Sequence, residues 1–420
     1  MKQRYIINMQ DIDNLDNLQI EVAPFTIFTG DNNSGKSTVM NVVYGIFTLS
    51  KEIIKNGDKD SKEYSICMEY IKNLKETREG YIDSEVGNIF CNFFNMSLLK
   101  NKEDFFNKIF NVSIENNYKR FENSNIFISN YRIFPKVYIS VDDFCDEILI
   151  EGDYVKIPSN LFEDEDYVLE LICNKIIEDG FMDTNISNSI FIPSGRSTFL
   201  CYHDIFRTIK YQNLSTSDFI DRVENLECIE DGVYSSIYNF IERDIVKGVF
   251  TNDSYKCSLN GIEIPISMAS DSIREIASLV LFLKSKERIT SFFIEEVESH
   301  LDLKLQRSIV SALVRIINSG TGIFMSTNSS IILDQICNFI LLNNLNRHKI
   351  EGFGYIINDV LNSNDVRIYE FNHSDNDRVF VNKLNVDYNG FKINMREEIL
   401  EDISKENLQL KFEMFDNNGR

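Results

Sequence analysis

The spacing of apolar residues predicts a mixed α/β protein in which buried strands alternate with helices. Residues 4–28 predict two or three strands, since apolar positions alternate over 18–22 and run almost continuously over 24–28. A helix ending near Ser50 is predicted next, from apolar residues at helical spacing: Val39, Met40, Val43, Ile46 and Phe47. Further buried strands, each followed by polar residues, are predicted at the starts of 189–199, 291–302 and 322–330.

The segment 51–185 has a different pattern, in which charged helical stretches alternate with short strand-like runs. It predicts an α+β insertion, either with its own core or acting as a lid, between the parts 1–50 and 186–420. Residues 197–258 predict a short helical lobe, with helices around 205–212 and 234–246.

Two more elements are predicted after this lobe. Ile262, Ile264 and Ile266 alternate as a half-buried strand, and a helix is predicted to begin near Ser272.

Composition favours a globular protein of the cytoplasm. The chain has 420 residues, 43% of them hydrophobic, and no apolar run approaches the roughly 18–20 residues that span a membrane. Its first residues, "MKQRYIINMQDIDNL", lack the apolar region and cleavage site of a signal peptide. Eight cysteines are scattered without a C-x-x-C pair, which indicates reduced cysteines rather than disulfides or a zinc site. We therefore expect a cytoplasmic protein that does not contact membranes.

"GDNNSGKST" matches the phosphate-binding P-loop, G-x-x-x-x-G-K-[ST], between a predicted strand and a predicted helix. Inward-turned backbone N–H groups and the helix N-terminus would hold the phosphates of ATP. Lys36 would reach the β- and γ-phosphates, and the Ser37 hydroxyl would bind Mg²⁺. The alternative is a glycine-rich turn that caps a helix. The candidate nucleotide-binding residues are Gly30, Asp31, Asn32, Asn33, Ser34, Gly35, Lys36, Ser37 and Thr38.

A second acidic motif complements the P-loop. In "SFFIEEVESHLD", Glu295 and Glu296 follow a buried strand. Adjacent carboxylates at a strand end are costly unless a metal ion or a nucleotide compensates them. They are therefore candidates for holding Mg²⁺ and for activating water, and the alternative is a solvated acidic turn.

Together these motifs resemble the ABC-type ATPase heads of RecF, of structural maintenance of chromosomes (SMC) proteins and of the OLD-like ATPases of bacterial phage defence. The resemblance covers about 1–50 and 186–345 and implies an ABC-type head, a P-loop NTPase with a mixed sheet flanked by helices. It implies that Glu295 is the Walker B acid, that Glu296 is the catalytic glutamate, and that residues 299–302 form the D-loop, ending in Asp302. Val297 stands where proline is usual.

Three further segments stand where the family has motifs, and each departs from the usual residues. Arg196 lies at the Q-loop position, where it would contact phosphate or a partner head, or else fix a turn. Ser270 matches the signature serine, whereas Ser272 replaces glycine. Residues 272–275 can also be explained as a helix capping box. Asn328 replaces the switch histidine, and an amide cannot carry a proton as an imidazole can.

The resemblance implies ATP-dependent dimers or higher oligomers, because in such heads each site is shared between one P-loop and the partner's signature helix. Its first functional implication is a defence or DNA-surveillance ATPase that controls a separately encoded effector, a nuclease or a toxin. The alternatives are a RecF-like repair ATPase that binds DNA directly and a nucleotide-dependent scaffold with little hydrolysis. A transporter ATPase fits least, since the Q-loop glutamine and the full signature are missing.

Charge bears on these alternatives. The chain has 43 Lys and Arg against 65 Asp and Glu, a formal net charge of −22. Tight DNA binding depends on neutralising phosphates with basic residues, so we expect weak DNA affinity for the chain alone. No nuclease motif is recognised, and the tail predicts a strand over 365–371 and a helix within 391–406.

Overall fold

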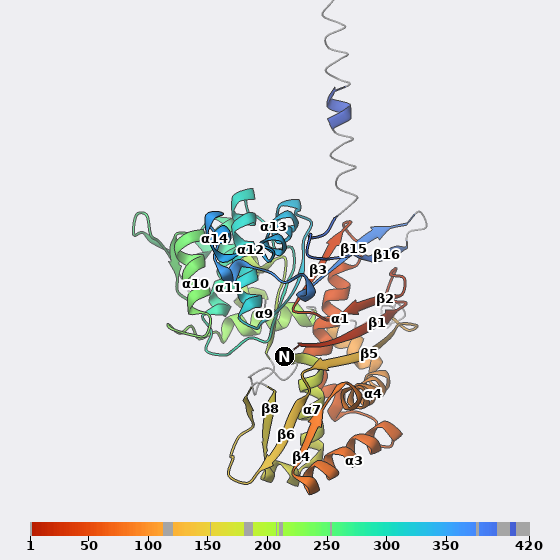
Figure 1. Cartoon of the computed structure of the whole chain (residues 1–420). Helices are drawn as coiled ribbons and strands as arrows, with labels where there is room; N and C mark the ends of the chain where they lie inside the picture. Colours follow the sequence, from red (N-terminus) through yellow and green to blue (C-terminus); the bar gives the residue numbers. More distant parts are fainter. Residues whose placement is uncertain are drawn as a thin grey trace, which may run out of the picture.

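A mixed sheet lies at the centre of the computed structural model, which describes residues 2–111, 121–151, 153–179, 188–206, 208–209, 213–252, 254–374, 378–392 and 404–408 (Figure 1). Within these residues its strand order is β16-β15-β3-β14-β13-β9, and all neighbours are parallel except the antiparallel pair β15 and β16. The bounds are β3 Phe25–Gly30, β9 Ser189–Ile192, β13 Ser291–Ile294, β14 Gly322–Ser326, β15 Val366–His373 and β16 Val379–Lys383. The predicted α/β class, with a mixed central sheet, is confirmed.

Both faces of this sheet are buried, which explains the continuous apolar runs of its strands. Phe293 and Phe324 contribute to one hydrophobic core, whereas the neighbouring Phe292 and Ile323 contribute to the other. The rings of Phe293 and Phe324 stack with centroids 4.6 Å apart and planes 5° apart. Alternate residues of each strand therefore join two separate cores.

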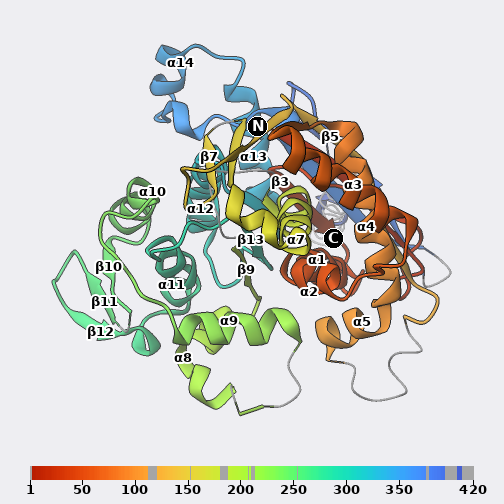
Figure 2. The same ribbon diagram turned by 90° about the horizontal axis from the view of Figure 1, so that it is seen from below.

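Helices cover the two faces of the sheet (Figure 2). The Phe293 face packs on α1 (Lys36–Thr48) and the neighbouring α2 (Ser50–Lys55), whose apolar residues belong to the same core. The opposite face is covered by α11 (Asp271–Leu283), α12 (Leu303–Asn318) and α13 (Ser330–Leu342), followed by the short α14 (Arg347–Gly352). The predicted helix after the P-loop is confirmed, although it breaks into two near Leu49.

A second sheet joins the start of the chain to the segment 51–185. Its order is β2-β1-β5, from β1 (Lys2–Gln10), β2 (Leu18–Glu21) and β5 (Asn125–Phe134). β5 pairs antiparallel with β1 along nearly its whole length. The inserted segment thus adds a strand to the sheet that β1 and β2 begin.

The remainder of 51–185 packs helices against a third sheet of order β4-β6-β8-β7. Its apolar side chains belong to the same core as those of α1. The helices are α3 Lys62–Thr77, α4 Ser84–Lys100, α5 Lys102–Phe110 and α7 Glu165–Asn174. The strands are β4 Glu79–Ile82, β6 Val137–Asp142, β7 Leu149–Glu151 and β8 Tyr154–Pro158.

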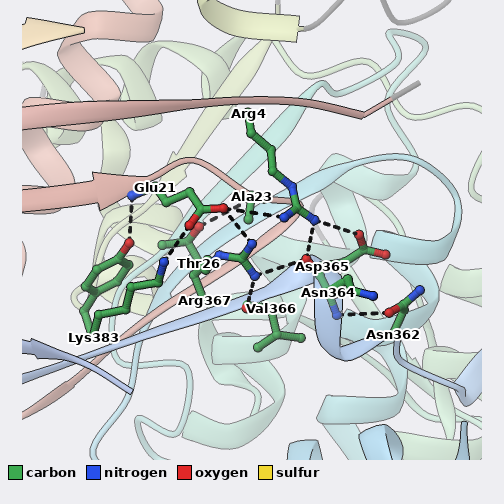
Figure 3. A network of polar contacts seen from close by, with 11 residues as sticks. Arg4, Glu21, Ala23, Thr26, Asn362, Asn364, Asp365, Val366, Arg367 and Lys383 are labelled. Atoms are coloured by element: carbon green, nitrogen blue, oxygen red, sulfur yellow. Dashed lines mark hydrogen bonds and ion pairs between the residues drawn. The ribbon is translucent and has the colours of Figure 1, made fainter. Parts of the chain in front are cut away.

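A charged network ties the second sheet to the central one (Figure 3). The carboxylate of Glu21, at the end of β2, accepts hydrogen bonds from Arg367 Nη2 at 2.6 Å and from Lys383 Nζ at 2.5 Å. Arg4 Nη1 of β1 lies 3.5 Å from the same carboxylate. Burial alone would raise the pKa of Glu21, but the bonds from Arg367 and Lys383 lower it to about 2.

The helical lobe differs in part from its prediction. It contains α8 (Arg196–Phe206), α9 (Leu214–Glu224) and α10 (Ser235–Phe240), followed by a π-helical turn at 241–245. Of the helix predicted over 205–212, residues 205–206 are helical as the end of α8, whereas 208–209 are not helical; 207 and 210–212 lie outside the described residues. Instead, the Asn213 side chain caps α9 by accepting a bond from the Thr216 N–H.

Short strands and the tail complete the fold. β10 (Gly248–Phe250), β11 (Ser254–Cys257) and β12 (Glu263–Pro265) form a small antiparallel sheet, which includes the strand predicted around Ile264. β15 confirms the strand predicted over 365–371. Most of the helix predicted within 391–406 lies outside the described residues. Residues 404–408, which the structure does describe, are helical.

Candidate functional site

The P-loop connects β3 to α1 in a conformation that requires glycine. Gly30 has a φ of +118°, and a Cβ added there would lie 2.1 Å from the carbonyl oxygen of Phe371. Gly35 also has a positive φ, of +85°, directly before the first residue of α1. A side chain at Gly30 would therefore push the loop away from β15.

Lys36 lies across this loop. Its Nζ donates to the carbonyl oxygens of Asp31 at 2.6 Å and Gly30 at 3.1 Å. Burial lowers the pKa of Lys36, and the charges of Asp31, Glu296 and Glu298 oppose that shift. The ammonium is therefore held by the loop's own carbonyl oxygens.

Glu295 and Ser37 meet at the end of β13. Glu295 is 9% exposed, and its backbone N–H bonds to the carbonyl of Ile192 in β9 at 3.0 Å. Burial raises the pKa of Glu295, whereas hydrogen bonds from the Ser37 side chain and the Ser194 N–H lower it. A hydroxyl and a carboxylate are hard oxygen ligands, so this pair fits Mg²⁺, which takes few ligands from protein.

Glu296, in contrast to Glu295, is exposed. Its φ of 42° is unusual for a residue with a side chain. The N–H of Glu296 donates to Ser326 Oγ at 2.9 Å, and Ser299 Oγ donates to its carboxylate at 3.3 Å. Ser326, the last residue of β14, is a supporting residue that the motifs did not predict.

The segment 327–330, directly after β14, contacts the P-loop through Asn328. Its carboxamide lies 2.9 Å from Asn32 Oδ1, and in the rotated orientation it donates to the Gly30 carbonyl at 2.8 Å. The Asn328 N–H donates to Glu298 Oε1 at 2.6 Å. Glu298, which sequence reasoning left without a role, therefore links the turn after Glu296 to the segment 327–330.

Arg196 is placed as a residue that fixes a turn. It is 3% exposed, and its Nη1 donates to the Glu295 carbonyl at 2.7 Å. Its Nε lies 2.7 Å from Glu275 Oε2, and both side chains are almost fully buried. Since the guanidinium is used within the chain, this arrangement favours the structural alternative over phosphate contact.

The start of α11 corrects the capping-box interpretation. The helix begins at Asp271 with Ser270 as its N-cap residue, and Ser270 makes no side-chain cap hydrogen bond. Glu275 is buried against Arg196 and does not reach back to cap the helix. In the described part of the chain, neither Ser270 nor Ser272 has a hydrogen bond to the P-loop.

Asp302 is used as a helix cap. Its Oδ1 accepts from the N–H groups of Lys304 at 2.8 Å and Leu305 at 2.9 Å, at the start of α12. This local role accounts for the residue type without a nucleotide.

The end of β15 also supports the P-loop, in a segment where the sequence showed no motif. The Asp31 N–H donates to the Phe371 carbonyl at 2.9 Å, and the His373 N–H donates to Asp31 Oδ2 at 3.0 Å. The His373 ring Nε2 lies 3.1 Å from the Asn32 carbonyl. The only available signal was the strand predicted over 365–371, whose pairing with β3 the motifs do not specify.

Two kinds of feature are absent from the described residues. They contain no cluster of three or more His, Cys, Asp or Glu side chains suited to a metal ion. None of their helices combines the length and apolar character needed to cross a bilayer.

No protein-family model and no curated protein matches this sequence. Among solved structures, the chain is similar to an SMC head bound to the C-winged helix domain of ScpA, with 9% identity over 91% of this chain and 98% of that one and a TM-score of 0.38. It is also similar to the SMC head domain from Thermotoga maritima, with 12% sequence identity and a TM-score of 0.38. That match covers 92% of this chain and 100% of the Thermotoga maritima chain. A third similar structure is a Pyrococcus furiosus SMC head domain with an extended coiled coil, with 10% sequence identity and a TM-score of 0.36. That match covers 96% of this chain and 100% of the Pyrococcus furiosus chain.

Proposed function

We propose that this chain binds and slowly hydrolyses ATP as a subunit of a bacterial defence or DNA-surveillance complex. ATP-driven pairing of two heads would control a separately encoded effector, a nuclease or a toxin. The observation that supports nucleotide binding most strongly is the position of Lys36 across a loop whose Gly30 admits no side chain, next to a Ser37 side chain that hydrogen-bonds Glu295.

Each residue of the site has a distinct proposed task. Lys36 exchanges its bonds to loop carbonyls for phosphate oxygens, and the N–H groups at the start of α1 bind the same phosphates. Ser37 and Glu295 hold Mg²⁺, which when bound neutralises charge on the phosphates. Glu296 orients the attacking water and accepts its proton, and Asn328 hydrogen-bonds the γ-phosphate.

The position of residues 267–284, the segment that resembles the signature motif, supports the proposed pairing of two copies. Figures 1 and 2 show α11 apart from α1, so Ser270 and Ser272 are proposed to complete the site of a second copy, as the resemblance implies. Ser270 is exposed at the helix N-terminus, where an anion is favoured.

Two properties of the chain favour a function in controlling a partner protein rather than in binding DNA directly. The net charge of −22 opposes DNA binding and favours association with a basic protein. Slow turnover, expected from the neutral amide of Asn328, would give a long-lived ATP-bound state for the partner to recognise.

A nucleotide-dependent scaffold is the second candidate, and Asn328 is the observation that favours it. The amide bonds within the loop and cannot take up a proton. If the chain is a scaffold, ATP binds but phosphate release stays at background.

The test compares phosphate release by the wild-type chain and Glu296→Gln, with ATP affinity measured on the same preparations. We expect Glu296→Gln to lower the turnover rate at least about a hundredfold with ATP affinity unchanged, since general base catalysis typically contributes 10²–10⁴-fold. Hydrolysis by the variant at the wild-type rate would remove Glu296 from this role and make Glu295 the candidate. Phosphate release at the background rate by both the wild-type chain and Glu296→Gln would favour the nucleotide-dependent scaffold.

A further inference from the structure

One face of the β4-β6-β8-β7 sheet carries a row of tyrosines. Tyr81 of β4 pairs in register with Tyr138 of β6, which pairs with Tyr154 of β8. Their exposed fractions are 43%, 46% and 41%. We call this surface the tyrosine face; Figure 1 shows its strands at the end of the molecule distant from α13 and α14.

The opposite face of the same sheet is buried in the hydrophobic core. Ile139 and Val155, the sequence neighbours of Tyr138 and Tyr154, are 2% and 3% exposed and belong to the core. Strands expose alternate residues on opposite faces, so the tyrosines cannot turn inward without breaking this core. Contiguous exposed apolar surface can mark an interaction site, so this row of half-exposed rings is a candidate binding surface.

The rings already interact with a cation. Lys136 Nζ lies 4.0 Å from the ring centroid of Tyr81 and 5.1 Å from that of Tyr138. An ammonium over an aromatic face is attracted by the negative charge of the π-system. In the described part of the chain no cation lies over Tyr154, so that end of the row is available.

Acidic residues border the available end. The segment 142–153 has six acidic residues and no Lys or Arg. Glu151 pairs in register with Tyr154, and Asp153 precedes it. Both acids are exposed, and among the described residues neither forms an ion pair, unlike Asp143, which pairs with Arg78 at 2.8 Å. Phe144, in the same segment, is 99% exposed.

We propose that the tyrosine face binds an arginine- or lysine-rich segment of a partner protein. The rings would stack against its side chains, and Glu151 and Asp153 would pair with their charges. This inference rests on the proposed function only in taking the partner to be the controlled effector.

The charges favour this occupant over two others. A single-stranded nucleic acid can stack on aromatic rings, but its phosphates would face the acidic segment. A second copy of the chain would bring another charge of −22 to the same surface.

The experiment measures the fluorescence anisotropy of a labelled dodeca-arginine peptide titrated with the full chain at 0.15 M salt. We expect Tyr138→Ala with Tyr154→Ala to weaken binding at least about fivefold, because the pair removes the aromatic surface at the available end of the row. Tyr138→Phe with Tyr154→Phe should bind like the wild type, since the rings remain. Glu151→Lys with Asp153→Lys should weaken binding at least as much as the alanine pair.

Matched controls separate this site from general attraction to an acidic protein. Tyr388→Ala removes a tyrosine that is 65% exposed on another surface, and Glu227→Lys with Glu230→Lys makes the same charge change on the helical lobe. We expect both to bind within about twofold of the wild type.

Several results would overturn the proposal. Equal weakening by the Glu227 and Glu230 pair would show non-specific attraction. A labelled (dT)12 that binds more tightly than the peptide and is released by the tyrosine variants would show a nucleic-acid surface. Nucleotide-free dimers that the alanine pair dissociates would identify a second copy as the occupant. ATP affinity, measured on every preparation, tests the proposed ATPase separately and shows that each variant is folded.

Discussion

At the scale of single residues, Glu296 depends on Ser326, a neighbour to which the sequence motifs assign no role. Its φ of 42° is a strained value for glutamate, and the bond from its N–H to Ser326 Oγ supports that backbone. The strained turn separates two adjacent carboxylates, so that Glu295 is buried against Ser37 while Glu296 is exposed.

Ser326→Ala is therefore expected to lower the turnover rate about tenfold while ATP affinity stays within about twofold, because a small misplacement of a catalytic group is costly. Phosphate release and calorimetry measure the two quantities. Ser308→Ala, which removes an exposed hydroxyl on α12 that bonds to the Lys304 carbonyl, is the control. A variant that loses ATP affinity in proportion to turnover would show that Ser326 supports the whole loop.

At the scale of elements, the buried pair of Arg196 and Glu275 joins α8 to α11 beneath the end of β13. We expect Arg196→Met to destabilise the chain by about 3–5 kcal/mol, because it leaves the Glu275 charge buried without its partner. Adding Glu275→Met should restore part of the loss. Urea unfolding measures both, and Arg243→Met, at an exposed pair with Asp244, should change little.

If the double variant were less stable than Arg196→Met alone, the hydrogen bonds from Arg196 to backbone carbonyls would be the dominant contribution, and the ion-pair explanation would be wrong.

The charged network between the β2-β1-β5 sheet and the central sheet predicts a stability that depends on pH. Because the folded-state pKa of Glu21 is about 2, below its ordinary 4.5, its contribution to stability is full above about pH 4.5 and is lost as the pH falls toward 2. Glu21→Gln should cost about 1–2 kcal/mol at pH 7. Urea unfolding at pH 7 and 3.5 should show a smaller difference at pH 3.5.

Glu351→Gln, at an exposed pair with Arg347, is the matched control, with a smaller expected cost at pH 7. A difference between wild type and Glu21→Gln that grows as the pH falls would contradict the assigned role of Glu21.

At the scale of the whole molecule, local patterns predicted the parts better than their assembly. The P-loop, β13 and β14 follow from short apolar runs and fixed motif spacing. The pairing of β1 with β5 joins residues about 120 positions apart, and neither strand specifies its partner by composition. Arg196 had two open interpretations for a similar reason, since its partner Glu275 lies 79 residues away.

The proposed pairing of heads is also a whole-molecule property. Glu296→Gln should accumulate ATP-bound dimers, because it retains the residues that hold ATP and Mg²⁺ but removes the proposed base. Light scattering should show twice the monomer mass for this variant with Mg-ATP and the monomer mass without nucleotide. Dimers of equal amount with and without ATP would contradict nucleotide-driven pairing.

The central claim, that the P-loop holds the phosphates of ATP, is tested most directly by calorimetric titration of Mg-ATP into the wild-type chain and Lys36→Ala. We expect ATP binding to weaken at least about tenfold in the variant, because a charge-assisted hydrogen bond is worth about 1.5–3 kcal/mol. Lys51→Ala, an exposed lysine on α2, should bind like the wild type. Equal affinity of the wild type and Lys36→Ala would contradict the assignment of this loop.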